Sequence, residues 1–481
     1  MRQLTRHDAS FLDADTIHAN SNVTFIQIYD QSTVPGGTLR FKTILAHIQG
    51  RLHRSGIFRS KLLRVPLELD EPYWVEDENF DLEYHVRHIA LPKPGDWRQF
   101  CIQASRIHAR ALDLHRPLWE IYVIEGLDSI TDLPPGSFAM LTKIHHAAID
   151  VESRNEFVEV LHDTTRRPPK VEPAEPWFPD PSPSAIPLLG RAGVNLLFAP
   201  AKLLRPLVRA APTAMSFARD LLQPEVHLTG TRFDAVVSPH RVFDTRRFLR
   251  SEFDRIRRLV PGATINDAVL AVCSGGLRSY LQSHGELPSA DLPAVVPSDI
   301  GAELAPDVAP RRISFGTRFA DPVERLAWIR AQTSAPPPAD VNGSLWSTGC
   351  TVAHVPGPAE PVYLHGARMT YFSAILPIAD GAGLVFAVSG YDGRIVVSPT
   401  SCRELMPDPQ VFTQSVRDSF QDYLALADAK ANARAARKPS PARSRASASD
   451  TRSPSRRKAR SGASPLRAGR ADRRRSKAPR R

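Results

Sequence analysis

Lys143-Ile144-His145-His146-Ala147-Ala148-Ile149-Asp150 is the stretch around which this sequence is organised. The residues leading into it, 137–144, form a short apolar run that predicts a buried strand ending in two adjacent histidines. An imidazole has a pKa near neutrality, so a histidine at a strand end is suited to removing a proton from a hydroxyl group. Asp150 stands four residues beyond His146, where a carboxylate can orient such a ring.

The same residues also have a purely structural interpretation. His145 and His146 can be ordinary polar residues at a strand exit, and Asp150 can cap the next helix. Short motifs recur by chance, so spacing alone favours this second interpretation. The residues by themselves leave both open.

Charge is distributed unevenly along the 481-residue chain. Residues 430–481 hold 19 Lys and Arg against two Asp, a net charge of +17, while the whole chain carries +11, which leaves −6 for residues 1–429. From Ala427 onward the sequence has almost nothing to bury, which predicts a disordered basic tail. Without aromatic residues the tail offers charge to anionic lipid or other polyanions, but no base stacking, so we expect no specific nucleic-acid recognition.

Cysteine usage and hydropathy favour a cytoplasmic protein. The four cysteines are widely separated and include no Cys-x-x-Cys pair, so we expect neither a disulfide framework nor a zinc site: Cys101, Cys273, Cys350 and Cys402. Residues 1–8 lack the apolar core of a signal peptide, and no window of about 18 uncharged apolar residues predicts a membrane-spanning helix. No phosphate-binding loop or metal-ligand cluster is found, so no cofactor is expected.

Strand and helix patterns alternate through the first 160 residues. Besides the strand into the histidine pair, β-branched and aromatic side chains predict strands at 23–29 and 121–124. Apolar residues at helical spacing predict helices at 41–52, 99–112 and 151–161. This alternation predicts a mixed sheet with helices packed against it.

A proline-rich connector follows this first block. Residues 165–187 contain eight prolines, a density that excludes helix or central strand. Residues 186–217 are then apolar and basic, with no acidic residue between Asp180 and Asp220. They fit helical segments lying in a membrane interface, but equally a crossing segment packed on protein.

A second block begins near Arg241. Thr264 and Asp267 predict a capping box, and the helix that it starts has the inward stripe Ile265, Ala268, Val269, Val272 and Gly276. Strands are predicted at 352–358, 383–389 and 394–397, and a helix is predicted to start at Asp408-Pro409. The predicted organisation is an N-terminal domain (1–164), a connector and crossover (165–240), a C-terminal domain (241–426) and a basic tail (427–481).

Six segments, in order, resemble those of one known family. The histidine stretch resembles the His-His-x-x-x-Asp-Gly signature of the CoA-dependent acyltransferase superfamily. The other five are similar to segments of the bacterial, mycobacterial-type wax ester synthase/diacylglycerol acyltransferase family: Leu4-Thr5-Arg6-His7-Asp8-Ala9-Ser10-Phe11-Leu12, Arg116-Pro117-Leu118-Trp119-Glu120, Ile265-Asn266-Asp267-Ala268-Val269-Leu270-Ala271, Val355-Pro356-Gly357-Pro358 and Arg403-Glu404-Leu405-Met406-Pro407-Asp408. The resemblance covers roughly residues 3–425.

The resemblance implies a fold and an activity. The fold would be α/β, with two chloramphenicol-acetyltransferase-like domains, each a mixed sheet with helices, and an active-site tunnel between them. The activity would be acyl-CoA:diacylglycerol O-acyltransferase, with wax ester synthesis from a long-chain alcohol as a further possibility. Acyl-CoA would be a substrate rather than a bound cofactor. The protein would be attached peripherally to the inner membrane or to the surface of lipid droplets.

The resemblance also implies roles for particular residues. His146 would be the general base, His145 would support it, and Asp150 would shape the loop through an ion pair with an arginine that the sequence does not identify. Asn266 and Asp267 match a pair that the family needs, although they also fit a helix start. Pro117, Leu118 and Trp119 fit a supporting role, with Trp119 as a large apolar anchor.

Three positions depart from the family pattern. Val151 replaces the glycine of the signature, His354 replaces an asparagine, and Asp299 stands in a segment that has lost its valine and arginine. A β-branched residue is unfavourable at positive φ, so Val151 would change the loop or intrude on the channel. The departures keep two alternatives open: a lipid-surface binding protein without turnover, and a transferase with a different acceptor such as an amine or a polyketide hydroxyl.

Overall fold

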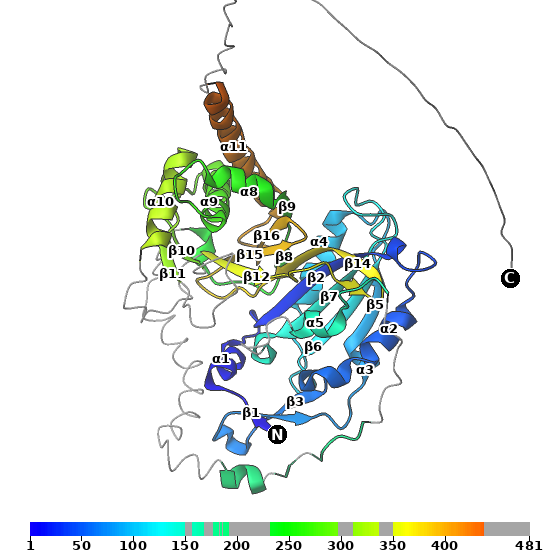
Figure 1. Ribbon diagram of the computed structural model, residues 1–481. Helices are drawn as coiled ribbons and strands as arrows, with labels where there is room; N and C mark the ends of the chain where they lie inside the picture. The colour runs from blue at the N-terminus through cyan, green and yellow to red at the C-terminus, as the bar shows by residue number, and fades with distance from the viewer. Residues whose placement is uncertain are drawn as a thin grey trace, which may run out of the picture. The chain divides into compact units, whose positions relative to one another are not determined.

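Two mixed sheets with flanking helices form the centre of the molecule in the computed structural model (Figure 1). The structure describes residues 1–149, 156–167, 177–181, 183–184, 186–191, 231–296, 311–335 and 350–436. Met1–Ala433 forms one compact unit. The expected mixed α/β architecture is confirmed. Asp150, Val151, Asp299, most of the crossover segment and nearly all of the basic tail lie outside the described residues.

The first sheet has six strands and carries the histidine pair at the end of one of them. Its strand order is β13-β14-β2-β7-β6-β5. In that order the strands are Tyr363–Leu364, Ala367–Ile375, Asn22–Asp30, Phe138–His145, Trp119–Glu125 and Val86–Ala90. The three strands predicted in the first block are therefore confirmed as β2, β6 and β7.

Helices cover both faces of this sheet because the residues of β7 alternate between two hydrophobic clusters. Met140 and Ile144 pack in the cluster that includes α2 (Phe41–Gln49) and α5 (described from Glu156 to Leu161). Ala139 and Leu141 pack on the other face, against α4. Helix α4 spans Trp97–Ala109 and begins with a capping box between Asp96 and Gln99, two residues before the predicted start.

The second sheet has seven strands, in the order β11-β10-β12-β15-β16-β8, with β9 also paired to β16. In chain order they are β8 Arg241–Phe243, β9 Arg246–Leu249, β10 Pro293–Val296, β11 Arg311–Ser314, β12 Cys350–Pro356, β15 Leu384–Tyr391 and β16 Arg394–Cys402. Asp392 and Gly393 join β15 to β16 with positive φ at both residues, as the shortest hairpins require.

Four helices pack with the second sheet around one core, and α8, α9 and α10 gather on the same side of it (Figure 1). They are α8 Arg250–Arg257, α9 Ile265–Ser283, α10 Pro322–Ser334 and α11 Pro409–Ala436. The capping box of Thr264 and Asp267 is confirmed at the start of α9. Helix α11 continues to Ala436, ten residues beyond the expected boundary at 426, so the first part of the predicted tail is helical.

Strand β14 belongs to the second block of sequence but lies in the first sheet, beside β2 (Figure 1). It is antiparallel to β2, with Phe372 opposite Gln27 and Ala374 opposite Phe25. The two halves of the chain therefore share backbone hydrogen bonds as well as side-chain contacts.

A third, three-stranded sheet lies near the N-terminus, in the order β1-β4-β3 (Arg2–Gln3, Tyr73–Glu76 and Ser60–Leu63). All four cysteines are free and buried. No helix within the described ranges is both long and apolar enough to cross a membrane.

Candidate active site

The two histidines occupy the end of β7 and the single 3-10 turn η5 that follows it (His146–Ala148). His145 is buried, with 1% of its surface exposed. Its Nδ1 accepts a hydrogen bond from the Ala147 amide at 3.1 Å, so Nδ1 carries no proton. The proton is therefore on Nε2, which donates to the Asp15 carboxylate at 2.9 Å. His145 thus holds the turn together in one fixed tautomer.

His146 is held at its backbone and at its ring. Its amide donates to the Ser21 carbonyl at 2.8 Å, and its carbonyl accepts from the Ile149 amide at 3.0 Å. Its ring stacks on Phe11, with 3.8 Å between the ring centroids and 18° between the planes. The side chain is half-buried, so the ring is held in position without being enclosed in the core.

Both histidines are held by the segment that runs from the end of α1 (Arg6–Ala14) to the first residue of β2, which we call the Asp15–Asn22 segment. Asp15 Oδ1 accepts from the Ser21 amide at 2.7 Å, so the same carboxylate closes the segment and binds His145. The Ser21 hydroxyl donates to the Phe11 carbonyl at 2.9 Å. The second half of the chain also contributes, because Arg241 donates to the His18 carbonyl at 2.8 Å.

Sequence reasoning missed Asp15 and Ser21 as parts of this site. Asp15 is 130 residues from His145, and nothing local to either residue indicates the contact. Phe11 lies inside the N-terminal segment that resembles the family, but the resemblance gave it no role.

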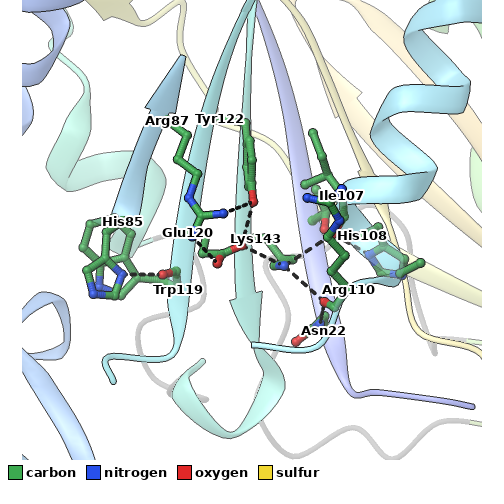
Figure 2. Close-up of polar contacts among 12 residues, drawn as sticks. Asn22, His85, Arg87, Ile107, His108, Arg110, Trp119, Glu120, Tyr122 and Lys143 are labelled. Carbon is green, nitrogen blue, oxygen red and sulfur yellow. Dashed lines mark hydrogen bonds and ion pairs between the residues drawn. The ribbon is translucent and has the colours of Figure 1, made fainter. Parts of the chain in front are cut away.

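The Pro117–Trp119 segment supports the same strand end. The Leu118 carbonyl accepts from the His145 amide at 3.0 Å. Trp119 is fully buried and its indole donates to the Phe58 carbonyl at 3.0 Å. His85 stacks on Trp119 and hydrogen bonds to its carbonyl at 2.7 Å (Figure 2). These contacts are those of packing residues.

Asn266 and Asp267 lie in the first turn of α9, and the contacts of Asp267 serve that helix start. Its carboxylate accepts from the Thr264 amide at 2.7 Å and from the Thr333 hydroxyl on α10 at 2.6 Å. Arg330 Nη1 on α10 lies 3.9 Å from the Asp267 Oδ2. Among the described residues, Asp267 therefore fixes α9 against α10. Asn266 is buried beside it.

The structure describes His354, one of the three departures from the family pattern, and the Val-Pro-Gly-Pro motif that follows it. His354 lies half-buried on β12, opposite Val388 of β15. Gly357 follows β12, and a Cβ at this position would overlap the Gly390 carbonyl, which explains a glycine in the Val-Pro-Gly-Pro motif. The expected roles of Asp150 and Val151 fall on residues that the structure does not describe.

One buried histidine, His108, lies close to Lys143 of β7. His108 on α4 bonds to the Thr24 hydroxyl at 2.9 Å. Burial, with the positive charges of Arg241 and Lys143, lowers the pKa of His108 to about 3, so this ring stays neutral. Within the described ranges, no cluster of three or more His, Cys, Asp or Glu side chains could hold a metal ion.

Comparisons with known proteins agree with the fold. Residues 4–269 match the family model described as wax ester synthase/diacylglycerol acyltransferase catalytic domain, and residues 338–423 match its C-terminal domain. The chain is 30% identical to O-acyltransferase WSD of Acinetobacter baylyi over 406 residues, 75% of this chain and 86% of that protein. It is 29% identical to a putative diacylglycerol O-acyltransferase of Mycobacterium tuberculosis, over 90% of this chain and 98% of that protein.

A solved structure shows the same fold. The wax ester synthase/diacylglycerol acyltransferase from Marinobacter aquaeolei VT8 superposes with a TM-score of 0.63 at 22% identity, covering 89% of this chain and 100% of that chain. By class, the chain is an O-acyltransferase, which takes an acyl donor and an acyl acceptor. It belongs to the wax ester synthase/diacylglycerol acyltransferase family.

Proposed function

We propose that this chain transfers the acyl group of acyl-CoA to the free hydroxyl of diacylglycerol, releasing triacylglycerol and CoA. A long-chain alcohol would serve as a second acceptor, giving a wax ester. The observation that carries the proposal is the placement of His146 at the end of β7, where its half-buried ring stacks on Phe11 and its backbone amide donates to the Ser21 carbonyl.

In this reaction His146 would act twice. It takes the hydroxyl proton as the acceptor oxygen attacks the thioester carbonyl. When the tetrahedral intermediate collapses and the C–S bond breaks, the imidazolium returns that proton to the departing CoA sulfur. The thioester is already activated, so the reaction requires no covalent enzyme intermediate. His145 cannot share this role while both of its ring nitrogens are engaged by Ala147 and Asp15.

We further propose that the enzyme works at the surface of a membrane or lipid droplet, because diacylglycerol and the product are insoluble in water. The start of the apolar, basic segment 186–217 supports this proposal, since Ile186 has 81% of its surface exposed and Leu189 is also exposed.

The test is a transfer assay with purified protein, labelled acyl-CoA and diacylglycerol in anionic vesicles. His146→Ala should lower kcat/KM by about 100-fold or more, because general-base catalysis contributes a factor of about 10² to 10⁴. His115→Ala is the matched control, since His115 is exposed and outside the site. Wild-type protein that forms no neutral lipid above the His146→Ala background would contradict the proposal.

Two further arms separate the alternatives. Replacing diacylglycerol by a long-chain alcohol, an amine or a polyketide hydroxyl identifies the acceptor, and faster turnover of an amine or polyketide would exclude diacylglycerol as the preferred one. Vesicle co-sedimentation of His146→Ala should equal that of wild type. Vesicle binding without any transfer would instead indicate a lipid-surface protein.

A further inference from the structure

Lys143 is a buried cation on β7, three residues before His146, with 0% of its side chain exposed. Its ammonium donates to Glu120 Oε2 at 2.9 Å, to the Arg110 carbonyl at 3.1 Å and to the Ile107 carbonyl at 3.3 Å (Figure 2). An ammonium group has three hydrogens, so each one has an acceptor. This arrangement holds the charged form in one position.

Glu120 has partners of its own besides Lys143. The Tyr122 hydroxyl donates to Glu120 Oε2 at 3.1 Å, and Arg87 lies 3.3 Å from Oε1. Arg87 also donates to the Tyr122 hydroxyl at 3.1 Å (Figure 2). The carboxylate is therefore held from two directions, and it presents a fixed negative charge to Lys143.

The two carbonyl contacts of Lys143 lie at the end of α4. Carbonyls in the last turn of a helix lack partners within that helix, and Lys143 supplies one for Ile107 and one for Arg110. The same end of α4 supports the Asp15–Asn22 segment. Asn20 donates to the Ala109 carbonyl at 3.0 Å, and Asn22 donates to the Arg110 carbonyl at 3.1 Å.

That segment in turn holds both histidines. It supplies the Asp15 carboxylate to His145 Nε2 and the Ser21 carbonyl to the His146 amide. A continuous set of hydrogen bonds therefore runs from Lys143, through the end of α4 and two asparagines, to the turn that carries the proposed base.

We propose that Lys143 is a positioning residue for acyl transfer. Its ammonium fixes the end of α4, and through Asn20 and Asn22 it fixes the Asp15–Asn22 segment that sets the position of His146. This inference rests on the proposed role of His146 as the base. Small displacements of a catalytic group have large effects, since about 1 Å can cost about 10²-fold in rate.

The competing explanation is that Lys143 and Glu120 are only a balanced buried ion pair. The two explanations differ when both charges are removed together. Removing one partner leaves an uncompensated buried charge, whereas replacing both by neutral residues of similar volume is often neutral for stability. Lys143→Met with Glu120→Gln therefore removes the carbonyl contacts of Lys143 without leaving a buried charge behind.

The experiment compares wild type, Lys143→Met, Glu120→Gln and the double variant. We expect Lys143→Met to lose stability and the double variant to recover a Tm near that of wild type. In the transfer assay the double variant should still lose about 10-fold or more in kcat, with the KM for acyl-CoA changed less than about 2-fold. Glu120→Gln alone, which keeps both carbonyl contacts of Lys143, should retain most of kcat. Wild-type kcat in the folded double variant would overturn the proposal.

A second readout does not depend on turnover. Long-range ¹H–¹⁵N NMR of histidine-labelled protein reports the protonated nitrogen of each ring, and wild-type His145 should show the Nε2–H tautomer. The double variant should shift the His145 and His146 signals, and unshifted signals would overturn the proposal whatever the kinetics. If wild-type protein transfers no acyl group to any acceptor, the proposed function fails, and these spectra alone then decide whether Lys143 positions the turn.

Asn20→Ala covers the case in which the double variant does not fold. This variant removes one contact between the segment and α4, and leaves the buried charges intact. It should lower kcat and shift the His145 signals in the same direction, to a smaller extent. An Asn20→Ala protein with wild-type kcat and wild-type histidine signals would contradict the proposed link.

Discussion

The carboxylate of Asp15 is engaged on both oxygens, by His145 Nε2 and by the Ser21 amide. An ionised carboxylate accepts hydrogen bonds and donates none, and both of these contacts need an acceptor. Asp15 therefore determines which nitrogen of His145 carries the proton. It also links Ser21, whose carbonyl accepts from the His146 amide, to His145, whose Nδ1 accepts from the Ala147 amide in η5.

Replacing Asp15 by Asn should separate these two roles. The amide oxygen can still accept from Ser21, but the amide nitrogen faces the Nε2–H of His145 with a second donor. We expect kcat to fall by about 10-fold or more, since the site depends on geometry that hydrogen bonds maintain. Kinetics and the His145 NMR signals would measure the effect. Asp13→Asn, at an exposed position of α1, is the control, and equal kcat in the two variants would contradict this role for Asp15.

At this scale, the sequence predicted what is local and missed what is distant. The histidine pair and its strand are contiguous, so pattern and resemblance were sufficient to place them. The contacts that orient them come from Phe11, Asp15 and Ser21, more than 120 residues earlier in the chain, and periodicity carries no information about such pairs. Lys143 and Glu120 were visible only as neighbours of motif residues.

The contact between α9 and α11 is made at Gly276, a member of the inward stripe predicted for α9. A Cβ at Gly276 would lie 2.7 Å from the Val416 Cα and 2.9 Å from its backbone nitrogen. Helix backbones cannot approach so closely around a larger side chain. The glycine is therefore required by packing, although it weakens the helix by its propensity.

Gly276→Ala should destabilise the protein by about 1–3 kcal/mol, the usual cost of overpacking a core. Urea unfolding would measure the loss, with the midpoint falling and the slope unchanged. Gly56→Ala is the matched control, because a Cβ there has no atom within 4 Å. Equal midpoints for the two variants would show that α9 and α11 can separate freely.

Element boundaries show where sequence signals end. The start of α9 was predicted correctly because its capping box lies within four consecutive residues, Thr264 to Asp267. The strand predicted at 394–397 extends in β16 to Cys402, because its last residues pair with β8, which lies some 150 residues earlier in the chain. The helix predicted at 41–52 ends at Gln49, and Leu52 opens a separate 3-10 turn. The start of a helix with a capping box can therefore be read from neighbouring residues, whereas the end of β16 depends on its pairing with a distant strand.

Acid stability is a property of the whole compact unit, and two buried histidines contribute to it. His47 bonds to the Leu161 carbonyl at 2.9 Å, and His162 bonds to the Tyr29 hydroxyl at 2.7 Å. Burial lowers the pKa of each ring to about 4. The unfolded chain binds these protons near pH 6.5 and the native protein only near pH 4, so their contribution is complete above about 6.5 and is lost as the pH falls towards 4.

The free energy of unfolding should therefore decrease between pH 6.5 and pH 4, by about 1.4 kcal/mol for each unit of pKa difference and each ring. Urea unfolding at a series of pH values would show the slope. His162→Gln removes one of these groups and should make the slope shallower, while His115→Ala should leave the slope unchanged. An identical slope in His162→Gln would show that this ring is already protonated, or exposed, in the native protein.

Strand β14 has a consequence for the synthesis of the protein on the ribosome. The histidine-bearing sheet receives its last strand, β14, from residues 367–375, more than 200 residues after β7 has been translated. Until then β2 presents a bare edge, which is the kind of surface that recruits other chains. A chain truncated before residue 375 would therefore expose the edge of β2, and we expect it to aggregate rather than to form a smaller enzyme.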